Sequence, residues 1–584
     1  MSQNGPVGNG PSAAEAAVHR NDDEASRQRS TAPHYNSFPN YRAIQHETPN
    51  DHETSTQKQA AAAAGSGGKP SARVLGPDLL RGLLMMFMAM DHLGIALRPW
   101  EHGLGRHAEK DGVPVKEWNR PAGYLVRSLT HLCAPGFTLL LGTGVVYLGH
   151  SRRRQQGWSA FRLLRYFALR AVALTVVMIV HSLVMTAGQL WFLNIVLFAL
   201  AADYFLAGAL WLAADETERW LARRLARALV DNKDDDDTAC ARDNDMDAEQ
   251  PLLHAAEGRP PTRSSTSTST EAKAASISWH VHNGLLVVLS IVTIFWNIWL
   301  SENYGECAAT SSSAAAMSEG VAVTAPAGRT PGWDDRKMDE YWWLRLWFYE
   351  TNAPGVLSAF PPLAWLSFAI VGVLYARVII SSERPRRGAA GPARILMLHL
   401  AAGLVLAVAF VLTRLLHVGN LSEHCLQTPE NRQPPRVGGS SNQYLASPAA
   451  FFYTVKYPPD VAFWALTLAA NFFLLAGLWR VPAAFARKWL AIVLDFGTAS
   501  LFFYVVHMPV VFVTGWAACV LFGHEPGPGA PPSPGGGLVS DKVIDSVFGF
   551  FAVWALCLLI MWPLCRWYGL FKFGKPSDSL WRIL

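Results

Sequence analysis

Four ionisable residues lie in an otherwise apolar stretch near the start of the sequence. They are Asp78, Arg81, Asp91 and His92, within PDLLRGLLMMFMAMDHLG, which starts at Pro77. A stretch this long and this apolar is typical of a helix that crosses ~30 Å of hydrocarbon. A charge at the centre of such a helix costs about 2.5–3.5 kcal/mol, so ionisable residues there are candidates for function.

Helical geometry divides these four side chains into two groups. At about 100° per residue, Asp78, Arg81 and His92 fall within one arc of about 60°, and Asp91 points elsewhere. At 1.5 Å per residue, Arg81 and His92 lie ~16 Å apart along the axis. The arginine is therefore predicted near one membrane surface, where a guanidinium can hold phosphates, and the imidazole in the opposite half, where it can exchange a proton.

The next apolar block carries a similar pair. Arg127 and His131 are spaced i, i+4 and share one face of a helix. Because this helix runs the other way, His131 is expected at a depth close to that of His92. A plainer interpretation, in which the arginines reach the membrane surface and the histidines only pack, stays open for these residues. The same depth is predicted for His181, His417 and His507, so we expect a polar cavity that opens outward.

Ten apolar blocks could position these residues. The chain has 584 residues, of which 51% are hydrophobic and 16% charged. We predict an all-α, polytopic membrane protein with about ten transmembrane helices, because each block is wide enough to span a bilayer. The blocks lie near 79–97, 125–148, 167–187, 190–212, 281–300, 356–380, 395–416, 460–479, 491–519 and 544–565.

Basic residues in the loops indicate the orientation. If the spans alternate, Arg152-Arg153-Arg154, Arg384-Pro385-Arg386-Arg387 and Arg487-Lys488 all fall on one side. The positive-inside rule makes this side the cytosol, so both termini are predicted to be cytosolic. The same rule explains the formal net charge of +5, and we therefore expect no nucleic-acid partner.

Composition divides the chain into five predicted segments. The long insertion contains Asp234-Asp235-Asp236-Asp237 and a Ser/Thr run from Ser264 to Thr270. The segments are a disordered cytosolic tail (1–70), a first membrane part of four helices (73–213), a disordered acidic cytosolic insertion (214–278), a second membrane part of six helices (279–570) and a cytosolic tail (571–584).

Two features of the predicted outer loops are weaker signals. Asn420-Leu421-Ser422 is a glycosylation sequon. Cys307 and Cys425 could form a disulfide or remain thiols, and the sequence leaves both readings open. No CxxC motif is present, and we predict no metal site.

Several short motifs occur in order along the chain. The first is R-x-x-x-x-D-x-x-R-G-L from Arg73 to Leu83, followed by M-x-x-D-H from Met88 to His92. Thr130–Phe137 (THLCAPGF), Leu141–Gly144 (LGTG), Lys456–Pro459 (KYPP) and Leu501–His507 (LFFYVVH) follow. Together, over residues 73–570, they resemble the heparan-α-glucosaminide N-acetyltransferase catalytic-domain family of the membrane acyltransferase superfamily.

This resemblance implies transfer of an acetyl group from cytosolic acetyl-CoA across the membrane to an amino sugar or glycan. His92 and His131 would be catalytic, with His92 acting either as a base or as the group that carries the acetyl. The lysosomal member of the family uses a histidine in the loop after its first helix, and in this chain that loop offers His102 and His107. Asp78, Arg81 and Arg127 would bind acetyl-CoA, and His507, Lys456 and Tyr457 are further candidates.

Two other function classes fit the same residues. A polytopic transporter also places charges on facing helices, although the chain halves show no repeat. A catalytically inactive membrane scaffold would use the tails and the acidic insertion for partners. The sequence does not distinguish an endomembrane from the plasma membrane, or a monomer from a homodimer.

Overall fold

The computed structural model describes residues 75–100, 121–244, 263–301, 342–383, 391–423, 425–426, 442–527 and 539–575. Within these ranges, ten helical segments are long and apolar enough to cross a membrane. This confirms the predicted helical fold and the predicted number of apolar spans, and it indicates a multi-pass membrane protein. The predicted tails and the candidates His102 and His107 lie outside the described residues, apart from 571–575.

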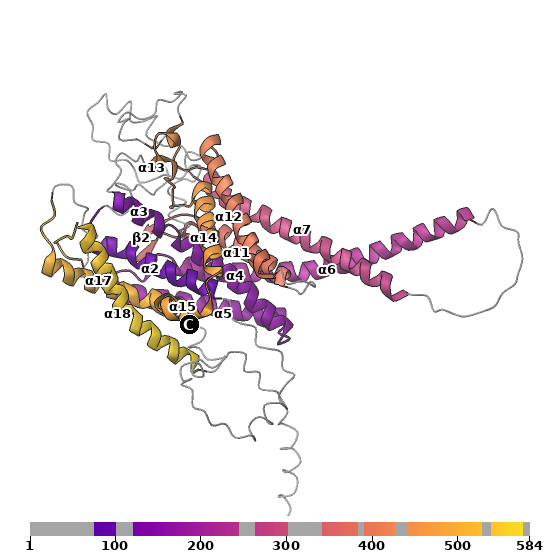
Figure 1. The fold of residues 1–584 in the computed structure, drawn as a ribbon, viewed down its shortest axis with the longest axis horizontal. Coiled ribbons are helices and arrows are strands. Elements are labelled where there is room, and N and C mark those ends of the chain that lie inside the picture. Colours follow the sequence, from indigo (N-terminus) through magenta and orange to yellow (C-terminus); the bar gives the residue numbers. More distant parts are fainter. Residues whose placement is uncertain are drawn as a thin grey trace, which may run out of the picture. The chain divides into compact units, whose positions relative to one another are not determined.

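The described chain is mostly helical, with one small sheet (Figure 1). The helices are α2 (Gly76–Leu97), α3 (Pro121–Thr130), α4 (Cys133–Arg154), α5 (Ala160–Met185), α6 (Leu197–Asn244), α7 (Arg263–Trp299), α10 (Trp342–Phe348), α11 (Pro362–Glu383), α12 (Gly391–Leu416), α13 (Pro448–Phe451), α14 (Val461–Trp479), α15 (Ala483–Trp489), α16 (Ala491–Thr498), α17 (Ser500–Phe522) and α18 (Val547–Phe573). The strands are β1 (Phe192–Asn194), β2 (Thr351–Ala353) and β3 (Val356–Ser358), and a 3₁₀ helix covers Gln443–Leu445.

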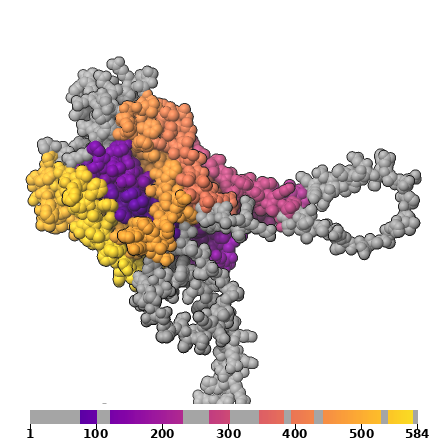
Figure 2. Space-filling model, viewed as in Figure 1, coloured from indigo at the N-terminus to yellow at the C-terminus, as the bar shows by residue number. Residues whose placement is uncertain are grey.

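Helix α2 packs against α3, α4, α14, α16, α17 and α18. Figure 2 shows its indigo surface framed by orange and yellow helices from later in the chain. Glycines allow its closest contact. A Cβ on Gly82 would lie 1.8 Å from the Val493 carbonyl oxygen, and a Cβ on Gly497 would lie 1.9 Å from the Asp78 carbonyl oxygen. Backbone therefore meets backbone where α2 crosses α16.

Two of the predicted spans are broken helices. The block at 125–148 contains the end of α3 and most of α4, because Pro135 has no N–H to donate to the His131 carbonyl. The Asn471 side chain donates to the neighbouring Leu132 carbonyl at 3.2 Å. The block at 491–519 contains α16 and most of α17, which are separated by Ala499 in a non-helical conformation (φ −106°, ψ 31°). Apolar composition alone did not indicate either break.

A three-stranded sheet was not predicted. Its order is β1-β3-β2, with β1 parallel and β2 antiparallel to β3. Strands of three residues are too short to show an alternating pattern in the sequence. The buried Asn194 side chain donates to Ser358 Oγ at 2.9 Å and to the Phe360 carbonyl at 2.7 Å, which ties the end of β1 to the chain leaving β3.

Much of the segment 214–278, which we expected to be disordered, is helical. Helix α6 runs on to Asn244, and α7 begins at Arg263; the two helices pack against each other (Figure 1). Arg219 pairs with Asp215 one turn away at 2.7 Å, and Ser278 donates to the Glu218 carbonyl at 2.8 Å. Such i, i+4 pairs and contacts between helices favour a helix where composition alone suggested a loop.

The sequon asparagine is buried. Asn420 is 2% exposed, and its amide nitrogen donates to the Thr413 carbonyl at 2.9 Å and to Glu423 Oε1 at 2.7 Å. Its amide oxygen accepts from Arg414 at 2.7 Å. This side chain is therefore a structural hydrogen-bonding group in the folded protein. Cys425 is buried as well, and Cys307 lies outside the described residues.

Candidate active site

Two buried histidines meet between α2 and α17. His92 Nδ1 lies 2.8 Å from His507 Nε2, and the two rings are stacked with their centroids 5.0 Å apart. His92 is 7% exposed and His507 is fully buried. The structure thus brings into contact two residues that were predicted at a common depth. The sequence gave no indication of this contact.

Hydrogen-bond partners determine which nitrogens carry protons in this pair. His507 Nδ1 lies 3.0 Å from the Phe503 carbonyl and 2.7 Å from the Tyr504 carbonyl. Carbonyl oxygens only accept, so Nδ1 must be the donor, and Nε2 of a neutral His507 is an acceptor. His92 Nδ1 then donates to it. The remaining nitrogen of a neutral His92 ring, Nε2, is therefore a proton acceptor.

Aromatic packing holds His507 in this orientation. The Phe503 ring stacks on it with centroids 5.4 Å apart, and the Tyr504 ring lies 5.9 Å away. Both rings belong to the same turn of α17, so local helix geometry sets the position of the imidazole. Two aromatic residues of the LFFYVVH motif therefore fix the orientation of the histidine that ends it.

His92 faces a small cavity of about 40 Å³. At ~10–15 Å³ for each water, this space holds about three water-sized groups. Asp91 also lines the cavity, although the helical wheel placed it on a different face of the helix from His92. The lining residues are Met88, Asp91, His92, Thr130, Cys133, Ala134, Phe137, Ile195, Val196, Phe360, Lys456 and Tyr457.

Lys456 brings a cation to the cavity. It is 6% exposed, and its Nζ lies 5.0 Å from the Tyr457 ring centroid and 5.7 Å from that of Phe360. Arg127 supports the same loop by donating to the Thr454 carbonyl at 2.7 Å, with its guanidinium 4.6 Å from the Tyr453 ring. The structure therefore places Arg127 under the Lys456 loop.

Asp78 and Arg81 form an ion pair on the first turns of α2. Arg81 Nη1 lies 3.2 Å from Asp78 Oδ1, and the two side chains are 29% and 9% exposed. Met85 and Met88 follow Arg81 on the face that leads to His92, and both are buried. Met88 lines the cavity, whereas Arg81 and Met85 do not. Methionine side chains thus fill the expected path between the arginine and the imidazole.

The other predicted histidines have different surroundings. His131 sits at the break between α3 and α4, is not part of the cavity lining, and packs its ring 5.1 Å from Phe463. The His181 ring lies 6.3 Å from Tyr504. His417 pairs with Glu423 at 3.0 Å. The structure therefore brings together His92, His507, Lys456 and Tyr457, and His131 lies between Thr130 and Cys133, which line the cavity.

Sequence reasoning missed two other polar residues. Cys133 lines the cavity, and its thiol donates to the Leu84 carbonyl at 3.3 Å. Asp203 on α6 is fully buried, and neither of its carboxylate oxygens has a hydrogen-bond partner among the described residues. A lone carboxyl inside a membrane helix is typical of proton pathways, and its position on an apolar helix was the available signal.

Comparison of the chain with protein-family models gives no match, and a search of curated protein sequences gives none either. Within the described residues, no group of three or more His, Cys, Asp or Glu side chains could hold a metal ion. Membership of an acetyltransferase family is therefore a proposal, which depends on the motifs and on the chemistry of the cavity.

Proposed function

We propose that this chain is a multi-pass membrane acyltransferase that transfers an acetyl group from cytosolic acetyl-CoA to an amino sugar or glycan. The observation that carries the proposal is the buried pair of His92 and His507, 2.8 Å apart, at a cavity that also contains Lys456. A base oriented by a second group, beside a cation, is the arrangement that acyl transfer uses.

In this mechanism the acceptor arrives with a neutral amine or a hydroxyl. As its nitrogen or oxygen attacks the thioester carbon, His92 Nε2 takes the proton, and His507 holds the ring through Nδ1. The Lys456 ammonium stabilises the negative charge that develops on the carbonyl oxygen. The new C–N or C–O bond forms, the C–S bond breaks, and the CoA thiolate leaves and recovers the proton from His92.

The size of the cavity limits what it can hold without rearrangement. A volume of about 40 Å³ suits the three heavy atoms of an acetyl group, and it is too small for the pantetheine arm and the acceptor. Donor entry from the Arg81 side therefore requires Met85 and Met88 to move. Unbranched methionine side chains with three rotatable bonds are suited to this.

The decisive experiment uses the purified full chain, radiolabelled acetyl-CoA and a panel of amino sugars and glycans. We expect label transfer by the wild type, loss of transfer in His92→Gln, and full transfer in the control His280→Gln, which removes an exposed histidine on α7. Label kept on the protein without acceptor would indicate an acetyl-imidazole intermediate.

Undiminished transfer by His92→Gln would remove this residue from the mechanism. Solute uptake that consumes no acetyl-CoA would instead favour the transporter, to which the lone Asp203 carboxyl is suited.

A further inference from the structure

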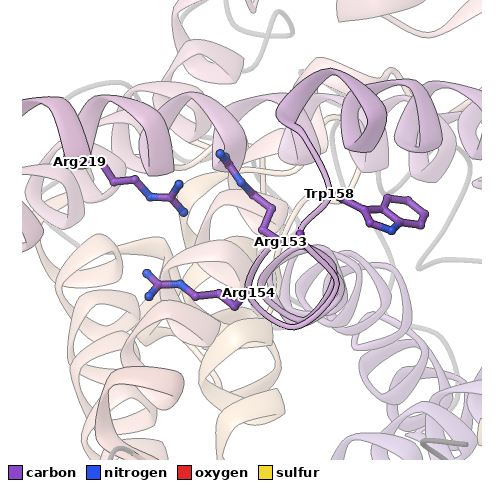
Figure 3. Close-up of a pocket in the computed structure, with 5 residues that line it drawn as sticks. Arg153, Arg154, Trp158 and Arg219 are labelled. Carbon is purple, nitrogen blue, oxygen red and sulfur yellow. The ribbon is translucent and has the colours of Figure 1, made fainter. Parts of the chain in front are cut away.

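A second and larger cavity lies at the C-terminal end of α4, away from the lining described above. It has a volume of about 580 Å³ and is lined by Arg153, Arg154, Gly157, Trp158 and Arg219. Figure 3 shows the guanidinium groups of the three arginines gathered on one side of α4, with the Trp158 ring turned away from them. We call it the arginine pocket.

Tight packing of α4 against α6 builds this pocket. A Cβ on Gly149 would lie 2.3 Å from the Trp211 ring, so only a glycine allows this contact. One turn further along both helices, Arg153 Nη1 meets Asp215 Oδ2 at 2.9 Å. The same carboxylate oxygen accepts from Arg219 at 2.7 Å. One carboxylate thus positions guanidinium groups from two helices.

The loop after α4 forms the opposite wall. Gly157 adopts φ +64°, a left-handed conformation that favours glycine, and the Trp158 amide donates back to the Arg152 carbonyl at 3.1 Å. The centroid of the Trp158 ring lies 4.8 Å from the guanidinium carbon of Arg152 and 4.2 Å from that of Arg162. This stacking fixes the wall and adds two more positive charges beside it.

The charge balance around the pocket is strongly positive. Asp215 and Glu216 are the carboxylates that pair with its arginines among the described residues, and both pair with Arg153. Arg219 is 41% exposed and Arg154 is exposed, so their remaining N–H groups face the open cavity. The arginines of the site and its walls are Arg152, Arg153, Arg154, Arg162, Arg219 and Arg223.

We propose that the arginine pocket binds a phosphate monoester group. Guanidinium groups form paired, charge-assisted hydrogen bonds with phosphate oxygens, and each arginine still has donors beyond those used by the carboxylates. The volume is within the range of small-ligand sites. The site is separate from the His92 cavity. Binding of a lipid headgroup there does not depend on the proposed acetyl transfer, whereas binding of CoA rests on it.

Two sources supply this chemistry. One is the headgroup of an anionic membrane lipid, because basic pockets between helices at the cytosolic surface recognise such headgroups, and the positive-inside pattern predicts that side for Arg152–Arg154. The other is a soluble nucleotide phosphate such as the 3′-phosphate of CoA. Both present the same phosphate oxygens to Arg154 and Arg219, so binding experiments must separate them.

The test is isothermal titration calorimetry of the purified full chain in neutral detergent. The ligands are dioctanoyl-phosphatidylinositol 4-phosphate for the lipid source, CoA for the soluble source, and dioctanoyl-phosphatidylcholine as the ligand without a monoester. We expect the double variant Arg154→Gln/Arg219→Gln to weaken binding of a phosphate monoester about tenfold or more. Thermal unfolding of the variant should match the wild type, because both side chains are exposed or half-exposed.

The matched control is Arg224→Gln/Arg227→Gln, which removes the same charge from an exposed stretch of α6 further along the helix. Its affinities should stay within about twofold of the wild type. Loss confined to the lipid titration assigns the pocket to a headgroup, and loss confined to the CoA titration assigns it to a nucleotide. Equal weakening in both double variants, or no phosphate binding by the wild type, would overturn the proposal.

Discussion

At the scale of single residues, the central feature is a histidine that acts through another histidine. His507 Nδ1 donates to the backbone carbonyls of α17, and His507 Nε2 accepts from His92 Nδ1. These contacts determine the tautomer of His92. Under the proposed mechanism, His507 is a positioning residue, and of the two histidines His92 is the one that meets the reacting atoms.

Replacement of His507 should therefore lower activity in a graded way. Leucine removes the acceptor for His92 Nδ1 and should reduce kcat by about 10²-fold or more, which is within the range for a positioned base. Glutamine keeps an acceptor oxygen and should retain more activity. The pH profile of kcat/KM should shift in the leucine variant, because the His92 imidazole loses the acceptor of its Nδ1–H. Equal activity of both variants with unchanged profiles would contradict this role.

Asp460 provides a pH-dependent contribution to stability. Burial raises the pKa of its carboxyl to about 6, with Arg414 opposing the shift, while the carboxylate caps α14 by accepting from the Phe463 amide at 2.6 Å. A pKa that is raised in the folded state favours the protonated form. The contribution of the protonated Asp460 carboxyl to the free energy of unfolding is present at low pH and is lost as the pH rises through about 6.

Asp460→Asn removes the titration and keeps an acceptor for the cap. Between about pH 4 and pH 7, the wild type should lose about 2 kcal/mol of unfolding free energy relative to this variant. Denaturant midpoints of both proteins across this range measure the difference. If the denaturant midpoints of both proteins changed with pH in parallel, the pKa of the Asp460 carboxyl would not be raised.

At the scale of elements, glycines decide where helices cross. Gly82→Ala should destabilise the protein by about 1–3 kcal/mol, because its Cβ would meet the Val493 carbonyl at 1.8 Å, and backbone must move. Gly94→Ala in the same helix is the matched control, since its Cβ would meet nothing within 4 Å. The control should be neutral or slightly stabilising. Thermal unfolding compares them, and equal losses would rule out the close crossing.

The elements also show what the sequence could predict. Apolar length was sufficient for ten spans, because a bilayer imposes one length on every helix. It could not reveal the breaks at His131 and Ala499, which depend on Pro135 and on packing against α2. Similarly, a common depth was predicted for His92 and His507, but contact between residues 415 positions apart depends on the tertiary fold.

At the scale of the whole molecule, the two ends of α2 carry different groups. The ion pair of Asp78 and Arg81 lies at one end, and the cavity of His92 lies near the other. If the donor enters past Arg81, this arginine should affect its binding more than the chemical step.

Arg81→Gln should raise the KM for acetyl-CoA about tenfold or more, with kcat within about threefold of the wild type. Arg81→Lys keeps the charge but has fewer hydrogen-bond donors, so its KM for acetyl-CoA should lie between those of the wild type and Arg81→Gln. Steady-state kinetics with Arg227→Gln as control separate this from a general effect of charge. A loss of kcat at unchanged KM would place Arg81 outside the donor path.

The buried Asn420 has a practical consequence for preparing the protein. In the folded chain its amide nitrogen is already committed to Thr413 and Glu423, so an oligosaccharyltransferase can act there only before this region closes. An attached sugar would then keep the region from closing. A mass-shifted fraction that is removed by a deglycosylating enzyme therefore counts the molecules that failed to mature, and it serves as a readout of folding yield.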